Sequence, residues 1–419
     1  GYRRFGSRLR LGVGTILMTI DADVVIVGGG PAGMATALFL IEHGIDVVLL
    51  ERSDKPHADP RAATYHPPTL EMLEKSGVTA ELHQRGLIAR HWQLRDRRVG
   101  LIAEFDLAAL GEDTRYPYRL QCEQHKLVEM MQRRVLQSTH SRVLHGVEVE
   151  TISQDESGVN VHGRTANGNC LIRGRWLVGA DGGRSIVRKS QNIAFDGFTW
   201  DERFLVITTD FDFATQGYAF SSYTMDPIEW VATFKIPGDR PQGLWRCVFP
   251  THPEQNDDDL LDHARAANRL DALSPATRGS AVVHTNLYSV HQRVAKTYRR
   301  DRVVLVGDAA HVNNPLGGMG LNFGLHDAYE LAPRLAAIIR GDADSSSLDV
   351  YDRRRRSVAE SVLQAQTIAN KKLLEEKDPV VRAQRQQDLR DTAADPVRAR
   401  AYLLRTSMIE GLRAAAHIR

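Results

Sequence analysis

The sequence predicts an α/β protein with a parallel-sheet domain, an antiparallel-sheet domain and a helical C-terminal region. Two observations support this fold class. First, "ADVVIV" and "RVVLV" are β-branched runs that each precede a glycine-rich turn and a helix, as buried parallel strands do. Second, residues 196–282 contain aromatic-rich runs such as "SYTMDPIEWVATFKIPG", in which polar and apolar residues alternate as in antiparallel strands.

The first glycine-rich turn lies in "VVIVGGGPAGMATALFL", where Gly28, Gly30 and Gly33 have the G-x-G-x-x-G spacing of a Rossmann-like unit. In such a unit the first glycine makes a tight turn, the second lets the backbone approach a pyrophosphate, and the third lets helix pack on strand. The helix N-terminus adds N–H groups and a positive dipole end. The next strand, "IDVVLLE", ends at Glu51, whose carboxylate can accept hydrogen bonds from an adenosine ribose. This unit predicts an ADP-containing cofactor.

Two later segments indicate that the cofactor is FAD. "RWLVGADGGRSIVRKS" is a strand that ends at Asp181, and "RVVLVGDAAHVNNPLGGMGLNFGLHDAYELAPRLAAII" is a strand that ends near Asp308, a loop and a helix. Asp308 is expected to accept hydrogen bonds from ribityl hydroxyls. The N–H groups of Gly320, Leu321 and Asn322 at the helix start are expected to face the flavin N1–C2=O edge. The two glycine-rich loops would then hold the two ends of one long cofactor.

Together these segments resemble the group A flavoprotein monooxygenases, the p-hydroxybenzoate-hydroxylase-like aromatic hydroxylases. The shared motifs are "GGGPAG", "RAATYHPPTLEML", "LQCEQHKLVEMM", "GADGGRSIVR", "GDAAHVNNPLGGMGLN" and "YDRRRR", within residues 20–360. Pro68 is a departure, because many relatives have arginine there. The resemblance places the 315–322 loop beside the flavin ring. It also implies that the cofactor-binding residues are Gly28, Gly30, Ala32, Gly33, Glu51, Arg52, Arg61, Gln124, Asp181, Asp308, Gly320, Leu321 and Asn322.

The resemblance further implies a single-component monooxygenase. NADH or NADPH reduces FAD, O2 adds to the flavin as a C4a-hydroperoxide, and a phenol or a hydroxylated heteroaromatic substrate is hydroxylated. "MDPIEW" and "LWRCVF" are similar to the phenol and phenolic-acid hydroxylase branch. Two alternatives stay open. One is a flavoprotein reductase of the same fold; the other is a flavin-dependent halogenase, which "ATFKIP" disfavours because Ala232 and Phe234 replace its tryptophans.

The candidate catalytic and substrate-binding residues are Pro315, Tyr223 and Arg246. The backbone of residues 315–318 is expected to contact the substrate ring. Tyr223 and Arg246 lie on the antiparallel sheet that is expected to cover the flavin. For Arg246, the alternative to a substrate contact is a structural ion pair.

Other conspicuous residues have structural interpretations. His311 lies in the second cofactor motif and is interpreted as a structural histidine near the flavin phosphates. The run Arg353–Arg356 is interpreted as a solvated helix face with one or two packing arginines, rather than a nucleic-acid contact. Trp230 and Trp245 either fill the antiparallel sheet or line the substrate pocket.

The predicted domain organisation is discontinuous. Residues 1–17 are expected to be a tag or a disordered extension, with Met18 as the natural start. In the C-terminal helices, one apolar stripe is expected to dock on the body or on another subunit, formed by Val397, Ala401, Leu404, Met408 and Leu412. The expected regions are the FAD-binding domain at 18–90, 115–195 and 283–345, the substrate-binding domain at 91–114 and 196–282, and the C-terminal helices at 346–419.

Composition excludes several partners. Lys+Arg is 54 and Asp+Glu is 52, which offers no electrostatic footprint for nucleic acid. The three cysteines show neither metal spacing nor a disulfide framework, so no metal site is expected and the cytoplasm is the predicted compartment. No apolar run approaches the roughly 20 residues of a membrane span. The expected partners are a small aromatic substrate, O2 and NAD(P)H, in a monomer or a homodimer.

Overall fold

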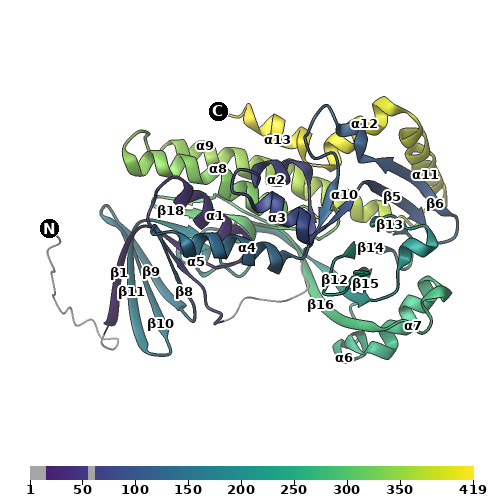
Figure 1. Ribbon diagram of the computed structural model, residues 1–419, viewed down its shortest axis with the longest axis horizontal. Coiled ribbons are helices and arrows are strands. Elements are labelled where there is room, and N and C mark those ends of the chain that lie inside the picture. The colour runs from purple at the N-terminus through teal and green to yellow at the C-terminus, as the bar shows by residue number, and fades with distance from the viewer. Residues whose placement is uncertain (1–15, 55–61) are drawn as a thin grey trace.

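The computed structural model describes residues 16–54 and 62–419, and its first sheet, sheet A, is the parallel sheet predicted from the sequence (Figure 1). Its strands are β1 (Ile16–Val27), β2 (Val47–Leu50), β8 (Ser141–Leu144), β9 (Glu148–Asp155), β10 (Gly158–Thr165), β11 (Gly168–Gly179), β17 (Arg299–Arg300) and β18 (Val303–Leu305). The order is β17-β18-β11-β1-β2-β8, and β1 pairs in parallel with both β11 and β2. The hairpin of β9 and β10 adds to β11 in antiparallel fashion.

Helices cover the central parallel strands of sheet A, whereas β9 at its antiparallel edge stays largely exposed. These helices include α1 (Pro31–Glu42), α4 (Gln124–Gln137), α5 (Ile186–Ser190) and α8 (Gly320–Arg340). Val24 to Val27 of β1 are all buried, as expected for a parallel strand with both faces covered. In α8 the apolar side chains of Leu325, Leu331 and Leu335 are fully buried. Helix α8 continues through Pro333 to its end at Arg340.

The second sheet, sheet C, contains the strands predicted within 91–114 and 196–282. Its strands are β5 (His91–Asp96), β6 (Gly100–Asp106), β12 (Phe195–Thr209), β13 (Ser221–Met225), β14 (Val231–Ile236), β15 (Leu244–Pro250), β16 (Val282–Ala295) and β19 (His311–Val312). The order is β19-β16-β12-β15-β14-β13-β5-β6, and the pairs are antiparallel except for the parallel pair β13–β5. Strand β16 pairs along β12 from Thr209 to Phe195, so most of the segment 283–295, assigned above to the first domain, belongs to this sheet.

Sheet C has two differently covered faces. One face packs against α6 (Asp257–Leu261) and α7 (His263–Leu273), where Leu260 and Leu270 are buried with Phe249. The other face packs against the C-terminal helices, where Leu403 is buried with Phe204. A small third sheet has the order β3 (Thr64–Tyr65), β7 (Arg119–Gln121) and β4 (Leu87–Ala89). Helices α2 (Pro67–Met72) and α3 (Val78–Arg85) lie between β3 and β4 in the chain.

The C-terminal helices lie along the upper and right-hand sides of Figure 1. They are α9 (Ser347–Val358), α10 (Ala365–Leu374), α11 (Pro379–Ala394), α12 (Pro396–Thr406) and α13 (Ile409–Ala416). Asp378 and Asp395 cap the starts of α11 and α12, because each accepts hydrogen bonds from two backbone N–H groups of the helix that follows. Within the described residues, no helix combines the length and apolarity needed to cross a membrane.

The apolar stripe predicted for the last helix is correct only in part, since Met408 is buried and Leu404 and Leu412 pack against buried clusters. Helix α12 ends at Thr406, and Met408 has a φ of 70°, which starts a new helix in another direction. Val397 is 79% exposed and Ala401 is also exposed, whereas Leu403 is fully buried. The sequence pattern assumed a single straight helix, and the break at Met408 rotates the buried face.

Candidate active site

The G-x-G-x-x-G turn joins β1 to α1 and has one open position. Gly28 has a φ of 107°, and a Cβ there would lie 2.3 Å from the carbonyl oxygen of Ala180. A Cβ on Gly33 would lie 1.9 Å from the carbonyl oxygen of Gly28. A Cβ on Gly30, by contrast, would meet no heavy atom within 4 Å. Gly28 and Gly33 therefore serve close packing, and Gly30 faces open space at the start of α1, which fits a pyrophosphate.

Glu51 lies at the end of β2 beside this turn, as predicted. Its carboxylate accepts hydrogen bonds from the backbone N–H groups of Gly29 and Ser53, both at 2.7 Å. These bonds hold the carboxylate in place at the edge of the open position. The next predicted contact, Arg52, has an exposed side chain. Arg61 lies outside the described residues.

The second glycine-rich segment packs directly on the first. Gly307 has a φ of 60°, and a Cβ there would lie 2.7 Å from Cβ of Ala32. Gly324 of α8 approaches the same point, since a Cβ on it would lie 3.1 Å from Cα of Gly307. Asp308 follows with an exposed side chain. The two loops, far apart in sequence, therefore form one continuous surface, as one cofactor held at both ends requires.

The carboxylate of Asp181 is used by the protein itself. It accepts hydrogen bonds from Ser185 Oγ at 2.5 Å and from the N–H groups of Ile186 and Val187 at 2.6 and 3.1 Å. Burial raises the pKa of Asp181, against the opposing effect of these donors. The side chain therefore holds the first turn of α5. It would support a bound cofactor indirectly, by fixing the backbone of the adjacent turn.

The loop before α8 is held at its start by side chains from β16 and α10. The N–H of Asn314 donates to Gln292 Oε1 at 2.6 Å, and its side-chain amide donates to the carbonyl of Thr367 at 3.0 Å. Asn314 Oδ1 accepts from the N–H of Leu316 at 3.0 Å, and Asn370 Nδ2 donates to the carbonyl of Leu316 at 3.1 Å. These four bonds fix the backbone of the loop.

The end of the same loop is held by the motif "TYHPP" and by sheet C. His66 Nε2 lies 2.8 Å from the carbonyl oxygen of Gly317, and Tyr223 Oη accepts the N–H of Gly317. Asn322 Nδ2 donates to the carbonyl of Gly318 at 2.7 Å, and Asn322 Oδ1 accepts the N–H of His66 at 3.0 Å. No side chain caps the start of α8. Its first N–H groups, at Gly320 to Asn322, therefore form a rigidly placed anion-favouring end.

Tyr223 and Arg246 lie on the face of sheet C that meets this loop. Tyr223 and Val248 pack in the same cluster as Leu316 of the loop, and Arg246 lies two residues from Val248 on β15. Trp245 and Cys247 point to the opposite face, toward α7. Of the two roles considered for the tryptophans, Trp245 therefore fills the sheet and does not line the loop side. Trp230 belongs to the cluster on the loop side, where its ring meets Phe204 edge-on.

Arg246 is buried, at 4% exposure, in electrostatic reach of Glu123 and Tyr288. Burial lowers the pKa of the Arg246 guanidinium to about 10, and the Glu123 carboxylate opposes this effect. Burial also raises the pKa of the Tyr288 hydroxyl, so this hydroxyl is neutral and can donate a hydrogen bond. Tyr223 is 8% exposed and its pKa is raised for the same reason.

His311 belongs to a buried charge network beneath the second loop. His311 Nε2 lies 2.7 Å from Asp327 Oδ2, and Arg355 Nε lies 2.6 Å from Asp327 Oδ1. Asp327 Oδ2 also accepts the N–H of Gly307 at 3.0 Å. The interpretation of His311 as structural agrees with this network, and Arg355 is the packing arginine expected within the run of four.

The remaining predicted residues lie around the same surface. Gln124 is the first residue of α4 and is half-buried, and Pro315 is half-buried with its carbonyl accepting the N–H of Gly318 at 3.0 Å. Sequence reasoning missed His66, Gln292 and Asn370. His66 lies in a quoted motif, directly before two prolines, and could have been identified there. Gln292 and Asn370 are isolated polar residues in periodic segments and carried no signal.

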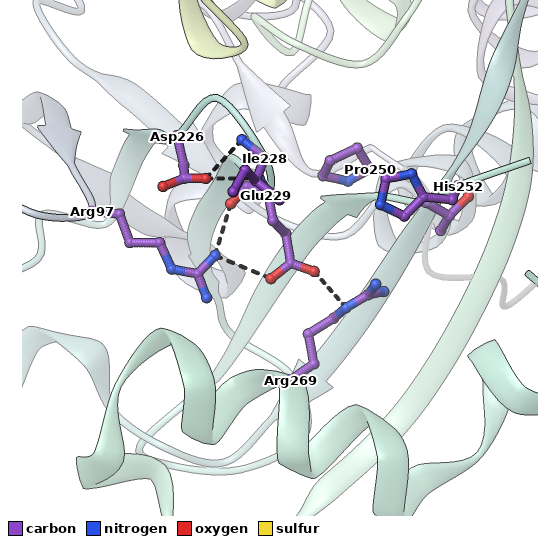
Figure 2. A pocket seen from close by; sticks show the side chains of 8 residues that line it. Arg97, Asp226, Ile228, Glu229, Pro250, His252 and Arg269 are labelled. Carbon is purple, nitrogen blue, oxygen red and sulfur yellow. Dashed lines mark hydrogen bonds and ion pairs between the residues drawn. The ribbon is translucent and has the colours of Figure 1, made fainter. Parts of the chain in front are cut away.

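A separate cavity of about 380 Å³ lies where β5, β13 and β15 end, and its lining includes Arg97, Asp226 and Pro250 (Figure 2). Glu229 lies between two arginines there, with Arg97 Nη1 at 3.1 Å and Arg269 Nε at 2.8 Å. None of the predicted site residues lines this cavity. Among the described residues, no group of three or more His, Cys, Asp or Glu side chains is arranged to hold a metal ion.

Comparisons with known proteins agree with this geometry. The family described as "FAD binding domain" matches residues 21–366. Para-nitrophenol 4-monooxygenase of Pseudomonas sp. (strain WBC-3) is 34% identical over 398 residues, 94% of this chain and 97% of that protein. 6-Hydroxy-3-succinoylpyridine 3-monooxygenase of Pseudomonas putida (strain DSM 28022 / S16) is 33% identical over 81% of this chain and 86% of that protein. The crystal structure of p-nitrophenol 4-monooxygenase from Pseudomonas putida DLL-E4 superimposes with a TM-score of 0.89 at 33% identity, covering 94% of this chain and 99% of that chain.

Proposed function

The chain belongs to the FAD-binding-domain family of aromatic monooxygenases, and we propose that its substrate is a phenol or a hydroxylated heteroaromatic ring. The protein is an FAD-dependent aromatic hydroxylase that uses NAD(P)H and O2, as the sequence predicted. The reductase and halogenase alternatives are therefore set aside. The names of the two relatives support the substrate class, since one acts on a nitrophenol and the other on a hydroxypyridine.

The cofactor residues fit FAD. The open position at Gly30 suits the pyrophosphate, Glu51 suits the adenosine ribose, and Asp308 suits the ribityl chain. The start of α8 offers N–H groups to an electron-rich ring edge. When bound, FAD accepts a hydride from NAD(P)H and activates O2. The protein's own contribution is to bind, to orient and to exclude water.

One observation carries the substrate site: the 314–318 loop is fixed against the Tyr223 face of sheet C. Tyr223 accepts the N–H of Gly317, which leaves its hydroxyl hydrogen to donate toward the pocket. Arg246 adds a buried positive charge on the same face. Aromatic and apolar side chains surround both, so a ring placed there is shielded from water. We assign the substrate ring to the space between the flavin, this face and the backbone at Pro315.

Product analysis tests the proposal. The holoenzyme is incubated with NADH or NADPH, labelled O2 and a panel of phenols and hydroxypyridines, and products are examined for one labelled oxygen atom. We expect substrate-stimulated NAD(P)H consumption with label in the aromatic product. If no phenol or hydroxypyridine acquires label while FAD is fully bound, the proposed function is refuted.

Variants then locate the ring. Tyr223→Phe and Arg246→Met should change substrate affinity, or the fraction of NAD(P)H that yields product, at normal FAD content. Cys247→Ala is the matched control, because Cys247 is a neighbour on β15 whose side chain points to the opposite face. Equal effects of all three changes would contradict the assigned face.

A further inference from the structure

Arg119 is a buried cation without a carboxylate partner among the described residues. It lies on β7 at 3% exposure. Its guanidinium forms neither an ion pair nor a hydrogen bond with a described residue, and its Nε is buried without a partner. Arginine stays protonated in proteins, so it cannot escape this cost by losing its charge. A buried, uncompensated charge is strongly unfavourable.

Other buried arginines of this chain are compensated. Arg355 forms its 2.6 Å pair with Asp327, and Arg188 donates to the carbonyls of Ala309 and Gly183, both at 2.8 Å. Arg246 has the Glu123 carboxylate in electrostatic reach. Arg119 differs from these arginines, and its charge therefore requires a negatively charged partner from outside the described residues.

The surroundings of Arg119 suit an aromatic anion. Its guanidinium lies over the Trp92 ring, 4.6 Å from the centroid, and Trp92 in turn meets Tyr223 edge-on at 4.4 Å. The Trp92 indole N–H lies 3.4 Å from the hydroxyl of Tyr402, which α12 contributes. Since Tyr223 also holds the N–H of Gly317, this cluster adjoins the loop assigned to the substrate ring.

Among the described residues, the titratable groups that interact electrostatically with Arg119 are Tyr223, Tyr402 and His66, and all three are neutral near neutral pH. Burial raises the pKa values of Tyr223 and Tyr402, and burial together with Arg119 lowers the pKa of His66 to about 3. The cluster of Arg119, Trp92, Tyr223, Tyr402 and His66 thus carries one net positive charge, supplied by Arg119.

We propose that Arg119 is the anion anchor of the substrate pocket and binds the ionised oxygen of an acidic phenol. This inference rests on the proposed function, and it narrows the substrate class from phenols in general to phenols that bind as phenolates. A guanidinium forms charge-assisted hydrogen bonds with an anionic oxygen, and the aromatic walls contact the ring. Binding therefore favours ionisation of the phenol and releases its proton to solvent.

The wild-type holoenzyme provides the first test. 4-Nitrophenol is titrated at a pH one unit below its own pKa, and proton release is measured by calorimetry in two buffers of different ionisation enthalpy. 4-Nitroanisole, which has no ionisable oxygen, is the control ligand. We expect proton release and tighter binding for 4-nitrophenol alone. If 4-nitrophenol binds no more tightly than 4-nitroanisole, or binds without proton release, the inference is overturned.

Variants provide the second test. Arg119→Met should weaken binding of 4-nitrophenol by about 10- to 150-fold, the range expected for one charge-assisted hydrogen bond, and should abolish proton release. Arg119→Lys should retain proton release with weaker binding, which separates loss of charge from loss of packing. Arg95→Met is the matched control, since Arg95 also stacks on an aromatic ring, Tyr218 at 4.1 Å, but is bound to the carbonyl of Gly217.

The two proposals fail differently. If labelled oxygen enters phenols but Arg119→Met binds 4-nitrophenol like the wild type, the anchor is wrong and the hydroxylase stands. If no phenol acquires label, the proposed function itself is wrong. FAD content and circular dichroism of each variant establish that the comparison concerns folded holoenzyme.

Discussion

Alanine substitutions at Gly30 and Gly33 separate cofactor contact from packing within one turn. Gly30 has φ −69° and ψ −175°, a conformation that alanine adopts readily, and its Cβ would meet nothing within 4 Å. Gly33 would place a Cβ 1.9 Å from the carbonyl oxygen of Gly28 and 3.1 Å from Cβ of Ala180. The same added methyl group therefore meets open space at one position and backbone at the other.

The expected magnitudes follow from these distances. Gly33→Ala should destabilise the FAD-free protein by about 1–3 kcal/mol, because α1 must move away from β1 to relieve the overlap. Gly30→Ala should change that stability by less than about 0.5 kcal/mol. Its methyl group would instead hold the pyrophosphate away from the backbone. Loss of one charge-assisted hydrogen bond, about 1.5–3 kcal/mol, corresponds to about 10- to 150-fold weaker FAD binding.

Two measurements check this. Urea unfolding of the FAD-free protein gives the stability of each variant, and fluorescence titration with FAD gives its affinity. We expect Gly30→Ala to be stable but weak in FAD binding, and Gly33→Ala to be unstable. Wild-type FAD affinity in Gly30→Ala would refute the placement of the pyrophosphate, and equal destabilisation of both variants would refute the contrast in packing.

Further outcomes concern the second loop, acid stability and the electron donor. Asp308→Ala should fold but lose FAD on dilution; unchanged FAD affinity would contradict the role of the second loop. Burial alone would raise the pKa of Asp327, but His311 and Arg355 lower it, so its contribution is complete above the unfolded value near 3.8 and is lost as pH falls through the folded value. Asp327→Asn should therefore cost about 3–5 kcal/mol in urea unfolding near neutral pH and less in strong acid. Burial lowers the pKa values of His66 and His326 from 6.5 to about 3. Below pH 6.5 the unfolded chain therefore binds protons at these histidines that the folded chain does not bind. Stability should fall by up to about 1.4 kcal/mol per pH unit for each histidine, and a flat profile between pH 7 and 5 would contradict this. Since the sequence has one complete dinucleotide unit, NAD(P)H should dock weakly, and rapid-mixing anaerobic flavin reduction should accelerate about 5- to 150-fold with substrate; equal rates would refute substrate gating.

Local patterns predicted much of the fold and of the cofactor site. The glycine spacing, the β-branched strand and the acidic residue at Glu51 lie within one supersecondary unit, so their relation is set by short-range geometry. The family, the FAD cofactor and the aromatic hydroxylase activity are confirmed by the comparisons. Alternation of polar and apolar residues along 196–282 likewise predicted sheet C, because successive side chains of a strand point to opposite faces of the sheet.

The error in the last helix shows where such patterns end. A periodic stripe assumes a straight helix, and no strong helix-breaking residue marks the turn at Met408. Strand β16 illustrates a second limit, since its pairing with β12 depends on which distant strand it meets.

The sequence by itself determined the two glycine-rich loops, the sheet classes and the family, because each depends on residues close together in the chain. Only the tertiary structure decided how the site is held. His66 reaches Gly317 across 251 positions and Asn322 reaches His66 across 256, and neither contact has a local signature. The same holds for Arg119 of β7, whose lack of a carboxylate partner among the described residues becomes visible only when β5, β13 and α12 are packed around it. Burial and partnership are properties of the assembled core, and therefore the residues proposed to choose the substrate emerge only from the fold.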